Sequence, residues 1–84
     1  MYLLVSNLSP ETTSQTLESL FNYYGQVEHV NLVLDGRGRS KGIAVVTLTQ
    51  EEDLDKIVEK LDGLLLDGNA IYIDKEEGEY RGPG

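Results

Sequence analysis

Hydrophobic and polar positions along the chain repeat with two different periods. Period-two alternation or a short apolar run, typical of strands, occurs in residues 2–6, 27–34, 41–48 and 70–75. Apolar residues at three- and four-residue spacing, typical of amphipathic helices, occur in two segments: Leu17, Leu20, Phe21 and Tyr24 in the first, and Leu54, Ile57, Val58 and Leu61 in the second. The pattern therefore predicts four strands and two helices.

Residue types at the ends of these segments support the predicted boundaries. Thr13 is expected to cap the first helix, and Gly25 is expected to end it. Thr49 is expected to cap the second helix in the same way. Asp67 and Gly68 form a turn signal that leads into the last strand.

The order of these elements defines the fold class. Two successive strand–helix–strand units predict an α+β, ferredoxin-like βαββαβ sandwich, in which a four-stranded antiparallel sheet carries both helices on one face. A three-helix bundle is excluded because the strand segments alternate with period two and are rich in Val and Ile. We expect one domain over residues 1–76 and a flexible linker or tail over residues 77–84.

Length and composition narrow the class of protein further. The 84 residues contain no cysteine, which excludes disulfides and thiolate zinc sites and suits a reducing compartment. No apolar run approaches the ~20 residues of a membrane span, and no signal peptide is visible, so we expect an intracellular protein with no membrane partner. The net charge of −8 argues, taken alone, against a polyanionic partner.

Two short motifs fall on the first and third predicted strands. Residues 41–48, KGIAVVTL, match the octamer of the RNA recognition motif at its basic first position and at Gly42, Ala44 and Val46. Residues 3–8, LLVSNL, match the hexamer of the same family. The chain resembles an RNA recognition motif over nearly its whole length, and the resemblance implies RNA binding on the open face of the sheet.

The sequence departs from the family at the positions that bind bases. In the family, aromatic rings stack on bases at the second hexamer position and at the third and fifth octamer positions. This chain has Leu4, Ile43 and Val45 there. Because each aromatic stack contributes ~1–3 kcal/mol, we expect RNA binding on the sheet face to be weak.

Alternation places further side chains on the open face. Leu4, Val33, Ile43 and Val45 are expected to form an aliphatic patch for contact with protein or RNA. An alternative is that the segment around Tyr80, or a segment outside this sequence, covers the patch. The polar and aromatic residues that we expect to contact RNA near the patch are Tyr2, Asn7 and Tyr72.

Three cations lie close together between the second and third strands. Arg37, Arg39 and Lys41 belong to a glycine-containing loop that is predicted to be flexible and to contact phosphates. An ordinary solvated hairpin loop is the alternative. Three phosphate contacts to single-stranded RNA predict a log–log salt dependence with a slope of only about −2, and hence weak, sequence-tolerant binding.

Other chemistry has little support in the sequence. His29 is the single histidine and has no catalytic or metal-binding companion motif, so we expect no metal, no cofactor, no small-molecule substrate and no enzymatic activity. The acidic residues of the second helix either dock a basic segment or form a solvated face, and the second is the commoner case; they are Glu51, Glu52, Asp53, Asp55 and Glu59.

Within the family, the motifs LLVSNL and GRSKGIAVV and the LDG turn are most similar to the ALY/REF group of nuclear mRNA export adaptors. That resemblance implies a domain that binds RNA weakly, arginine-rich arms on either side, mRNA export or processing proteins as partners, and a nuclear location with shuttling to the cytoplasm. Residues 80–84 resemble the start of such an arm. The alternative is a domain that binds only proteins within a splicing or ribonucleoprotein complex.

The distribution of charge changes what the total of −8 implies. Residues 1–50 contain four acidic and three basic groups, whereas residues 51–84 contain eleven acidic and four basic groups. The first half, which includes most of the sheet and the basic loop, is therefore nearly neutral. We expect weak RNA binding to be permitted and tight binding by these residues alone to be excluded.

Overall fold

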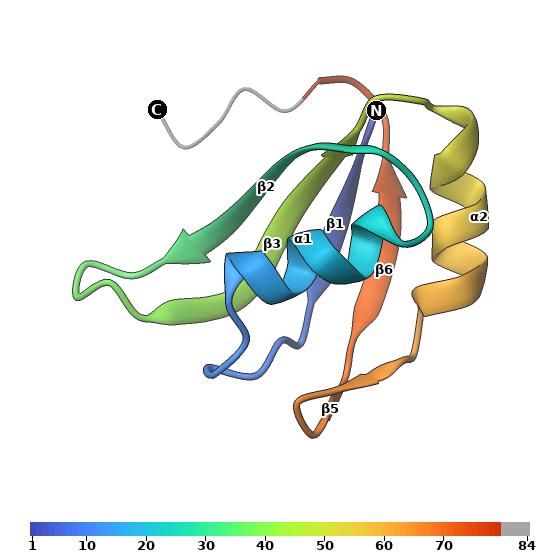
Figure 1. Cartoon of the computed structure of the whole chain (residues 1–84). Helices are drawn as coiled ribbons and strands as arrows, with labels where there is room; N and C mark the ends of the chain where they lie inside the picture. The colour runs from blue at the N-terminus through green and yellow to red at the C-terminus, as the bar shows by residue number, and fades with distance from the viewer. Residues whose placement is uncertain (80–84) are drawn as a thin grey trace.

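The computed structural model describes residues 1–79. The segment around Tyr80 and residues 80–84, considered above as a cover for the patch and as the start of an arm, lie outside the described residues. The elements in chain order are β1 (Tyr2–Ser6), α1 (Ser14–Asn22), β2 (Val27–Leu34), β3 (Ser40–Leu48), α2 (Glu52–Leu61), β4 (Leu65–Leu66), β5 (Asn69–Ala70) and β6 (Tyr72–Glu76). Figure 1 shows both helices packed against one sheet.

The main sheet has four strands in the order β2-β3-β1-β6, and all neighbours are antiparallel. β1 is central because Leu4 pairs with Val45 of β3 on one side and with Asp74 of β6 on the other. α1 connects β1 to β2, and α2 connects β3 to β6; in both cases one other strand of the sheet lies between the two connected strands, so both connections are crossovers. The predicted ferredoxin-like α+β fold is confirmed.

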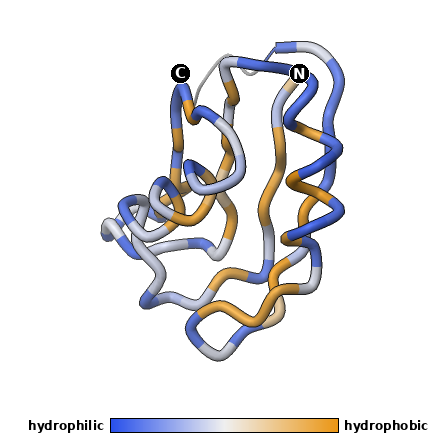
Figure 2. The backbone as a smooth tube through the Cα atoms, turned by 45° about the vertical axis from the view of Figure 1, so that its right-hand side comes forward, coloured by the Kyte–Doolittle hydropathy of each residue, from blue (hydrophilic) through white to orange (hydrophobic). Residues whose placement is uncertain are grey.

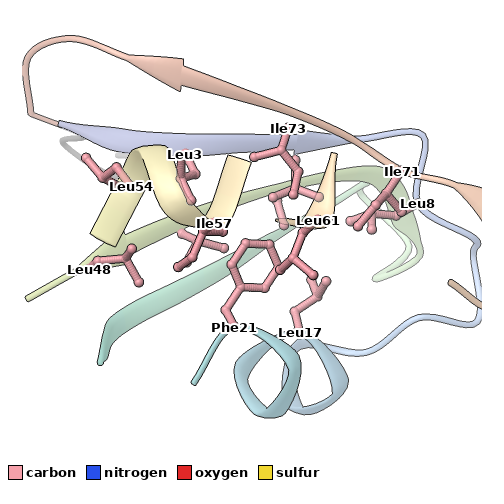
Figure 3. Packing of buried hydrophobic residues seen from close by; sticks show 13 residues of the cluster. Leu3, Leu8, Leu17, Phe21, Leu48, Leu54, Ile57, Leu61, Ile71 and Ile73 are labelled. Atoms are coloured by element: carbon pink, nitrogen blue, oxygen red, sulfur yellow. The ribbon is translucent and has the colours of Figure 1, made fainter. Parts of the chain in front are cut away.

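The hydrophobic core lies between the sheet and the two helices. Phe21 and Leu17 of α1 meet Ile57 of α2 there, and all three side chains are fully buried (Figure 3). β1 and β3 contribute every second residue to this cluster: Leu3, Val5, Ala44, Val46 and Leu48. No helix among residues 1–79 covers the opposite face of the sheet.

Helix ends agree with the sequence in one case and differ in the other. Thr13 caps α1, because its Oγ1 accepts a hydrogen bond of 3.1 Å from the backbone amide of Thr16. The prediction that Thr49 caps α2 is wrong: the N-cap position is Glu51, with no side-chain capping bond. The Thr49 amide donates instead to the Gln26 carbonyl at 2.9 Å, which keeps residue 49 beside the start of β2 and delays the helix.

α2 is amphipathic and carries its charges on the outside. Leu54, Ile57 and Leu61 are buried, whereas the residues between them are largely charged and exposed, and Figure 2 shows hydrophobic and hydrophilic residues alternating along its turns. Acidic residues fill its first turn, where the helix dipole stabilises them. No helix among the described residues is long and apolar enough to cross a membrane.

The last predicted strand is divided in two. β4 and β5 form a small hairpin in which Leu65 pairs with Ala70, and β6 joins the main sheet only after Ile71. Asp67 and Gly68 have φ values of 49° and 87°, the left-handed conformation that a tight two-residue hairpin turn requires at both positions. The turn was predicted, whereas the short hairpin around it was not, because two-residue strands have no detectable period.

Candidate nucleic-acid interface

The open face of the sheet presents one central row of four side chains. Asn31, Val45, Leu4 and Asp74 are successive partners across β2, β3, β1 and β6. An aliphatic pair therefore lies in the middle of the sheet, with an amide at one end and a carboxylate at the other. The row contains two of the three positions that stack on bases in the family, and neither carries a ring.

The aliphatic patch is less exposed than its composition suggests. Ile43 is 37% exposed, and Leu4 and Val33 are half-buried. Val45 lies on the open face as predicted but is only 4% exposed, because paired neighbours flank it on both sides. Val45 therefore offers little surface to a ligand, and Ile43 is the patch residue with the most surface available for contact.

Two tyrosines lie on the sheet but in different surroundings. Tyr72 of β6 is 55% exposed and stands opposite Ser6 of β1. Tyr2 is half-buried and stands opposite Glu76. Tyr72 is therefore the aromatic ring of the described open face that a base or a partner side chain could reach most easily.

The loop between β2 and β3 contains a set of hydrogen bonds centred on Asp35. Asp35 Oδ1 accepts hydrogen bonds from the backbone amides of Arg37 at 2.8 Å and Arg39 at 3.0 Å. Asp35 Oδ2 lies 3.1 Å from Arg39 Nε. The two strands are also linked where the Asp35 amide donates to the Arg39 carbonyl at 2.7 Å. An aspartate that bonds to backbone amides two and four residues later is a recognised way of fixing a turn.

These contacts change the electrostatics of the loop. They hold the pKa of Asp35 below its ordinary value, chiefly through the Arg39 and Arg37 backbone amides; desolvation opposes this, and the Arg39 side chain and the Lys41 charge lower the pKa further. Arg39 is thereby partly committed to Asp35. Arg37 and Lys41 are exposed and, among the described residues, have no ion-pair partner within 4.0 Å.

Asn7 has a structural contact in addition to its predicted RNA contact. It adopts φ 60°, and its Nδ2 donates to the Ala70 carbonyl at 2.8 Å, while Asn69 Nδ2 donates to the Asn7 carbonyl at 3.1 Å. Thr12 Oγ1 also donates to Asp67 Oδ2 at 2.7 Å. The loop after β1 is therefore fastened to the β4–β5 hairpin, and the Asn7 side-chain amide is engaged in that contact.

The octamer glycine is explained by a close approach of backbone. Gly42 has φ 77°, and a Cβ atom at this residue would lie 3.1 Å from the Leu8 carbonyl oxygen. The Leu8 amide donates to the Gly42 carbonyl at 3.0 Å. Only glycine satisfies both conditions without strain, so part of the family motif serves the fold rather than the ligand.

Sequence reasoning missed three contributions to this surface. Asp35 orders the basic loop, Asp67 fastens the loop after β1, and Asp74 places a carboxylate beside Leu4. The spacing Asp-Gly-Arg-Gly was a signal for the first, because aspartate at the start of such a loop favours an Asx-type turn. The other two depend on strand register and contacts between distant segments, which no local pattern reports.

Metal-ligating side chains do not gather within residues 1–79. No group of three or more His, Asp or Glu side chains in this part of the chain could hold a metal ion. His29 is exposed and stands opposite Thr47 on the open face. It borders a hollow of about 460 Å³ that Glu28 and Glu51 also line.

The fold, the hexamer and the octamer together define a class of protein. The chain matches the RNA recognition motif family over residues 3–72, and it belongs to that family. The RNA recognition motif is a non-enzymatic binding fold that uses its open sheet face.

Individual relatives point to RNA biology in several compartments. Organelle RRM domain-containing protein 6, chloroplastic, of Arabidopsis thaliana is 36% identical over 74 residues, which cover 87% of this chain and 41% of that protein. The U11/U12 small nuclear ribonucleoprotein 35 kDa protein of Xenopus laevis is 36% identical, with 88% of this chain and 28% of that protein covered. The serine/arginine-type shuttling mRNA binding protein HRB1 of Saccharomyces cerevisiae is 32% identical, with 93% of this chain and 17% of that protein covered. The chain spans less than half the length of each.

Solved structures agree with the family. RNA Binding Protein PG1 superposes with a TM-score of 0.90 at 24% identity, covering 96% of this chain and 99% of that one, and so shares the fold. The RRM3 domain of Hrb1 superposes with a TM-score of 0.81 at 32% identity, covering 86% of this chain and 72% of that one. The names of the relatives include chloroplast, nuclear and shuttling proteins and therefore do not determine where this chain is located.

Proposed function

We propose that this domain is an RNA-binding adaptor module of the ALY/REF type, without catalytic activity. It contacts RNA weakly and without strong sequence preference through the β2–β3 loop, and it binds export or processing proteins through its helices and aliphatic sheet face. The observation that carries this proposal is the replacement of all three stacking positions by Leu4, Ile43 and Val45, next to a basic loop whose Arg37 and Lys41 are exposed.

The magnitude of the missing stacks decides how RNA is held. Each base stack on an aromatic ring contributes ~1–3 kcal/mol, so three missing stacks weaken binding by at least about a hundredfold. Aliphatic side chains offer contact area but no π face. Most of the remaining affinity then comes from phosphate contacts, which are electrostatic and tolerant of sequence.

The acidic edge of the sheet supports the same conclusion. Asp74 stands beside Leu4, and Glu76 stands beside Tyr2, so carboxylates border the part of the face that bases would cross. Phosphates are repelled there and attracted to the loop at the end of β2 and β3. A polar and aliphatic face of this kind suits a protein segment better than a polyanion.

The wider role rests on the resemblance to export adaptors. Names of relatives such as the shuttling mRNA binding protein HRB1 favour a role in mRNA handling. We infer that arginine-rich arms in the complete protein supply most of its RNA affinity and that the protein resides in the nucleus and shuttles to the cytoplasm. The domain then acts chiefly as the part that proteins recognise.

An NMR titration with a short unstructured RNA tests the RNA contact. We expect RNA to shift the amide signals of residues 36–41, and we expect these shifts to fade as salt rises. The logarithm of the binding constant should fall with the logarithm of the salt concentration with a slope of about −2. The double variant Arg37→Ala, Lys41→Ala should abolish these shifts, whereas Lys56→Ala and Lys60→Ala on α2 should leave them unchanged, because α2 lies on the other face. A spectrum that stays unchanged at millimolar RNA would refute the RNA contact.

A domain that binds only proteins is the second candidate. The observation that favours it is the Asp35–Arg39 pair, 3.1 Å between Oδ2 and Nε, which removes part of the positive charge from the loop. If the domain binds only proteins, the amide spectrum of the Asp35→Asn variant should not change when RNA is added. The adaptor proposal instead expects larger RNA-induced shifts in this variant, because Arg39 is released from Asp35.

A further inference from the structure

Charge on the open face follows three rows of side chains. The central row described above has one further row of four side chains on each side of it. Side chains on one face recur every second residue along a strand, so neighbouring rows lie ~7 Å apart. The row nearer the β2–β3 loop, named the loop-side row, is Val33, Ile43, Ser6 and Tyr72. The row on the other side, named the far row, is His29, Thr47, Tyr2 and Glu76.

Negative charge increases from the loop-side row toward the far end of the sheet. The loop-side row has no charged side chain, whereas the central row contains Asp74 and the far row contains Glu76. Three more carboxylates line the hollow of about 460 Å³ beside the far row: Glu28, Glu51 and Glu79. The Met1 ammonium, 3.8 Å from Glu51 Oε1, offsets part of that charge. In the other direction, the loop-side row is followed by the cations of the β2–β3 loop. RNA phosphates are therefore repelled from the far half of the face and attracted toward the loop.

The loop-side row offers both surface area and an aromatic ring. Tyr72 is 55% exposed and Ile43 is 37% exposed, and Ser6 and Val33 are half-buried. Neighbouring strands lie ~4.8 Å apart, so the four side chains of the row span ~14 Å from β2 to β6. In the family, a four-stranded sheet stacks two or three bases. The row is therefore wide enough for a short single strand, with cations at the β2–β3 end and a ring at the β6 end.

We propose that RNA crosses the sheet along the loop-side row, from the β2–β3 loop to β6, with one base stacked on the Tyr72 ring, while the far row stays outside the path. This path rests on the RNA contact of the β2–β3 loop proposed above and continues it across the sheet. It differs from the path that the family motifs imply, because the ring lies on β6 and not on β1 or β3. A polyanion that carries planar bases suits both ends of the row, whereas a neutral protein segment would gain nothing from the cations.

The surroundings of Tyr72 hold its ring in position. Its neighbours in the chain, Ile71 and Ile73, are buried in the core, so the backbone is fixed on both sides of the ring. Ser6, which stands opposite, is small and leaves the ring accessible. A ring on a fixed strand loses little freedom when a base stacks on it, which favours binding.

The path also separates the three residues near the patch that the sequence predicted to contact RNA. Tyr2 lies in the far row, opposite Glu76, and is half-buried. Asn7 uses its side-chain amide for the Ala70 carbonyl, at 2.8 Å. Tyr72 is therefore the one of the three that combines an exposed ring with a place in the uncharged row.

NMR titration of the full chain with a uridine hexanucleotide tests the path. We expect shifts of the Ser6, Ile43 and Tyr72 amides in addition to those of the loop, with the amides of the far row unshifted. Tyr72→Leu should weaken binding at least about fivefold, which corresponds to the loss of one base stack. Tyr72→Phe keeps the ring and should retain most of the affinity.

Two matched controls separate base stacking from other effects. An abasic ribose-phosphate chain of the same length carries the phosphates without the bases, so the Tyr72→Leu variant and the unaltered chain should bind it equally. Tyr23→Leu removes a tyrosine that is 83% exposed at the C-terminal end of α1, on the helix side of the sheet, and should bind the hexanucleotide as the unaltered chain does. Amide spectra of each variant verify that the fold is retained.

Different results would overturn the path and the RNA contact on which it rests. Affinity that Tyr72→Leu leaves unchanged, with the loop still shifted by RNA, would refute the stack on Tyr72 and leave the loop contact intact. Amide shifts of His29 and Thr47, or an equal loss of affinity in Tyr2→Leu, would place RNA on the far row. Shifts confined to the loop would leave the loop-side row to a protein segment. A spectrum without any change at millimolar RNA would refute the loop contact itself, and the path with it.

Discussion

Restoring one aromatic ring to the open face should strengthen RNA binding by an amount that the structure allows to be estimated. Ile43 is the most exposed of the three stacking positions, at 37%, so Ile43→Phe adds a ring without displacing buried atoms. One base stack contributes ~1–3 kcal/mol, which corresponds to about 5- to 150-fold tighter binding. We expect a gain within this range for a short unstructured RNA.

The matching substitution at Val45 should behave differently. Val45 is 4% exposed between paired residues on both sides, so a larger side chain there must displace its neighbours. Overpacking of this kind costs about 1–3 kcal/mol of stability. We therefore expect Val45→Phe to lower the free energy of unfolding and to gain less RNA affinity than Ile43→Phe.

Fluorescence anisotropy with labelled RNA at one fixed salt concentration measures the affinity, and urea unfolding measures the stability. Leu65→Phe is the control, because it adds the same ring at a leucine that is 70% exposed on β4, outside the main sheet. Unchanged affinity in a folded Ile43→Phe variant would refute the view that missing rings limit binding. In that case, Asp74→Asn combined with Ile43→Phe shows whether the carboxylate beside Leu4 blocks the face.

Three further predictions concern the scaffold. Gly42→Ala should destabilise the fold by about 1–2 kcal/mol or more in urea unfolding, because φ is 77° and the added Cβ would lie 3.1 Å from the Leu8 carbonyl oxygen. Gly36→Ala is the control and should have little effect, because the space around Gly36 is open. The pKa of Asp35 is lowered in the folded state, so its stabilising contribution to the loop is present above its ordinary pKa and is lost as pH falls through the lowered value. NMR titration of the Asp35 carboxyl group should find that lowered pKa. The Asp35→Asn variant should remove the pH dependence of the Arg37 and Arg39 amide shifts. Phe21→Ala should cost about 3–5 kcal/mol in thermal or urea unfolding, because its side chain is fully buried between sheet and helices, and a loss below 1 kcal/mol would contradict the described core.

The fold was predictable from the sequence because its signals are local and repeated. Alternation in β1 and β3 and helical spacing around Phe21 and Ile57 are each readable within about ten residues. The α2 cap was mispredicted because the Thr49 amide is bound to Gln26, a contact between segments more distant in the sequence. Local propensity gave way to a tertiary hydrogen bond there.

The interface was predictable only in its residue types. Alternation assigns Leu4, Ile43 and Val45 to one face, but it does not reveal that Val45 lies sealed between its neighbours while Ile43 is exposed. Exposure depends on strand order, and the strand order follows from pairings between segments far apart in the chain. For the same reason, the carboxylate of Asp74 beside Leu4 was not recognised as part of the site.

The central position of β1 has a consequence for how the chain folds during synthesis. Leu3 near the start of the chain pairs with Val46 on one side and with Lys75 on the other. Within this domain, β1 is the first strand to leave a ribosome and the last to obtain both neighbours, and its second edge stays open until β6 has emerged. Because closing such long loops costs entropy before any contact compensates for it, folding should be completed in one late step, after nearly all of the domain has been made.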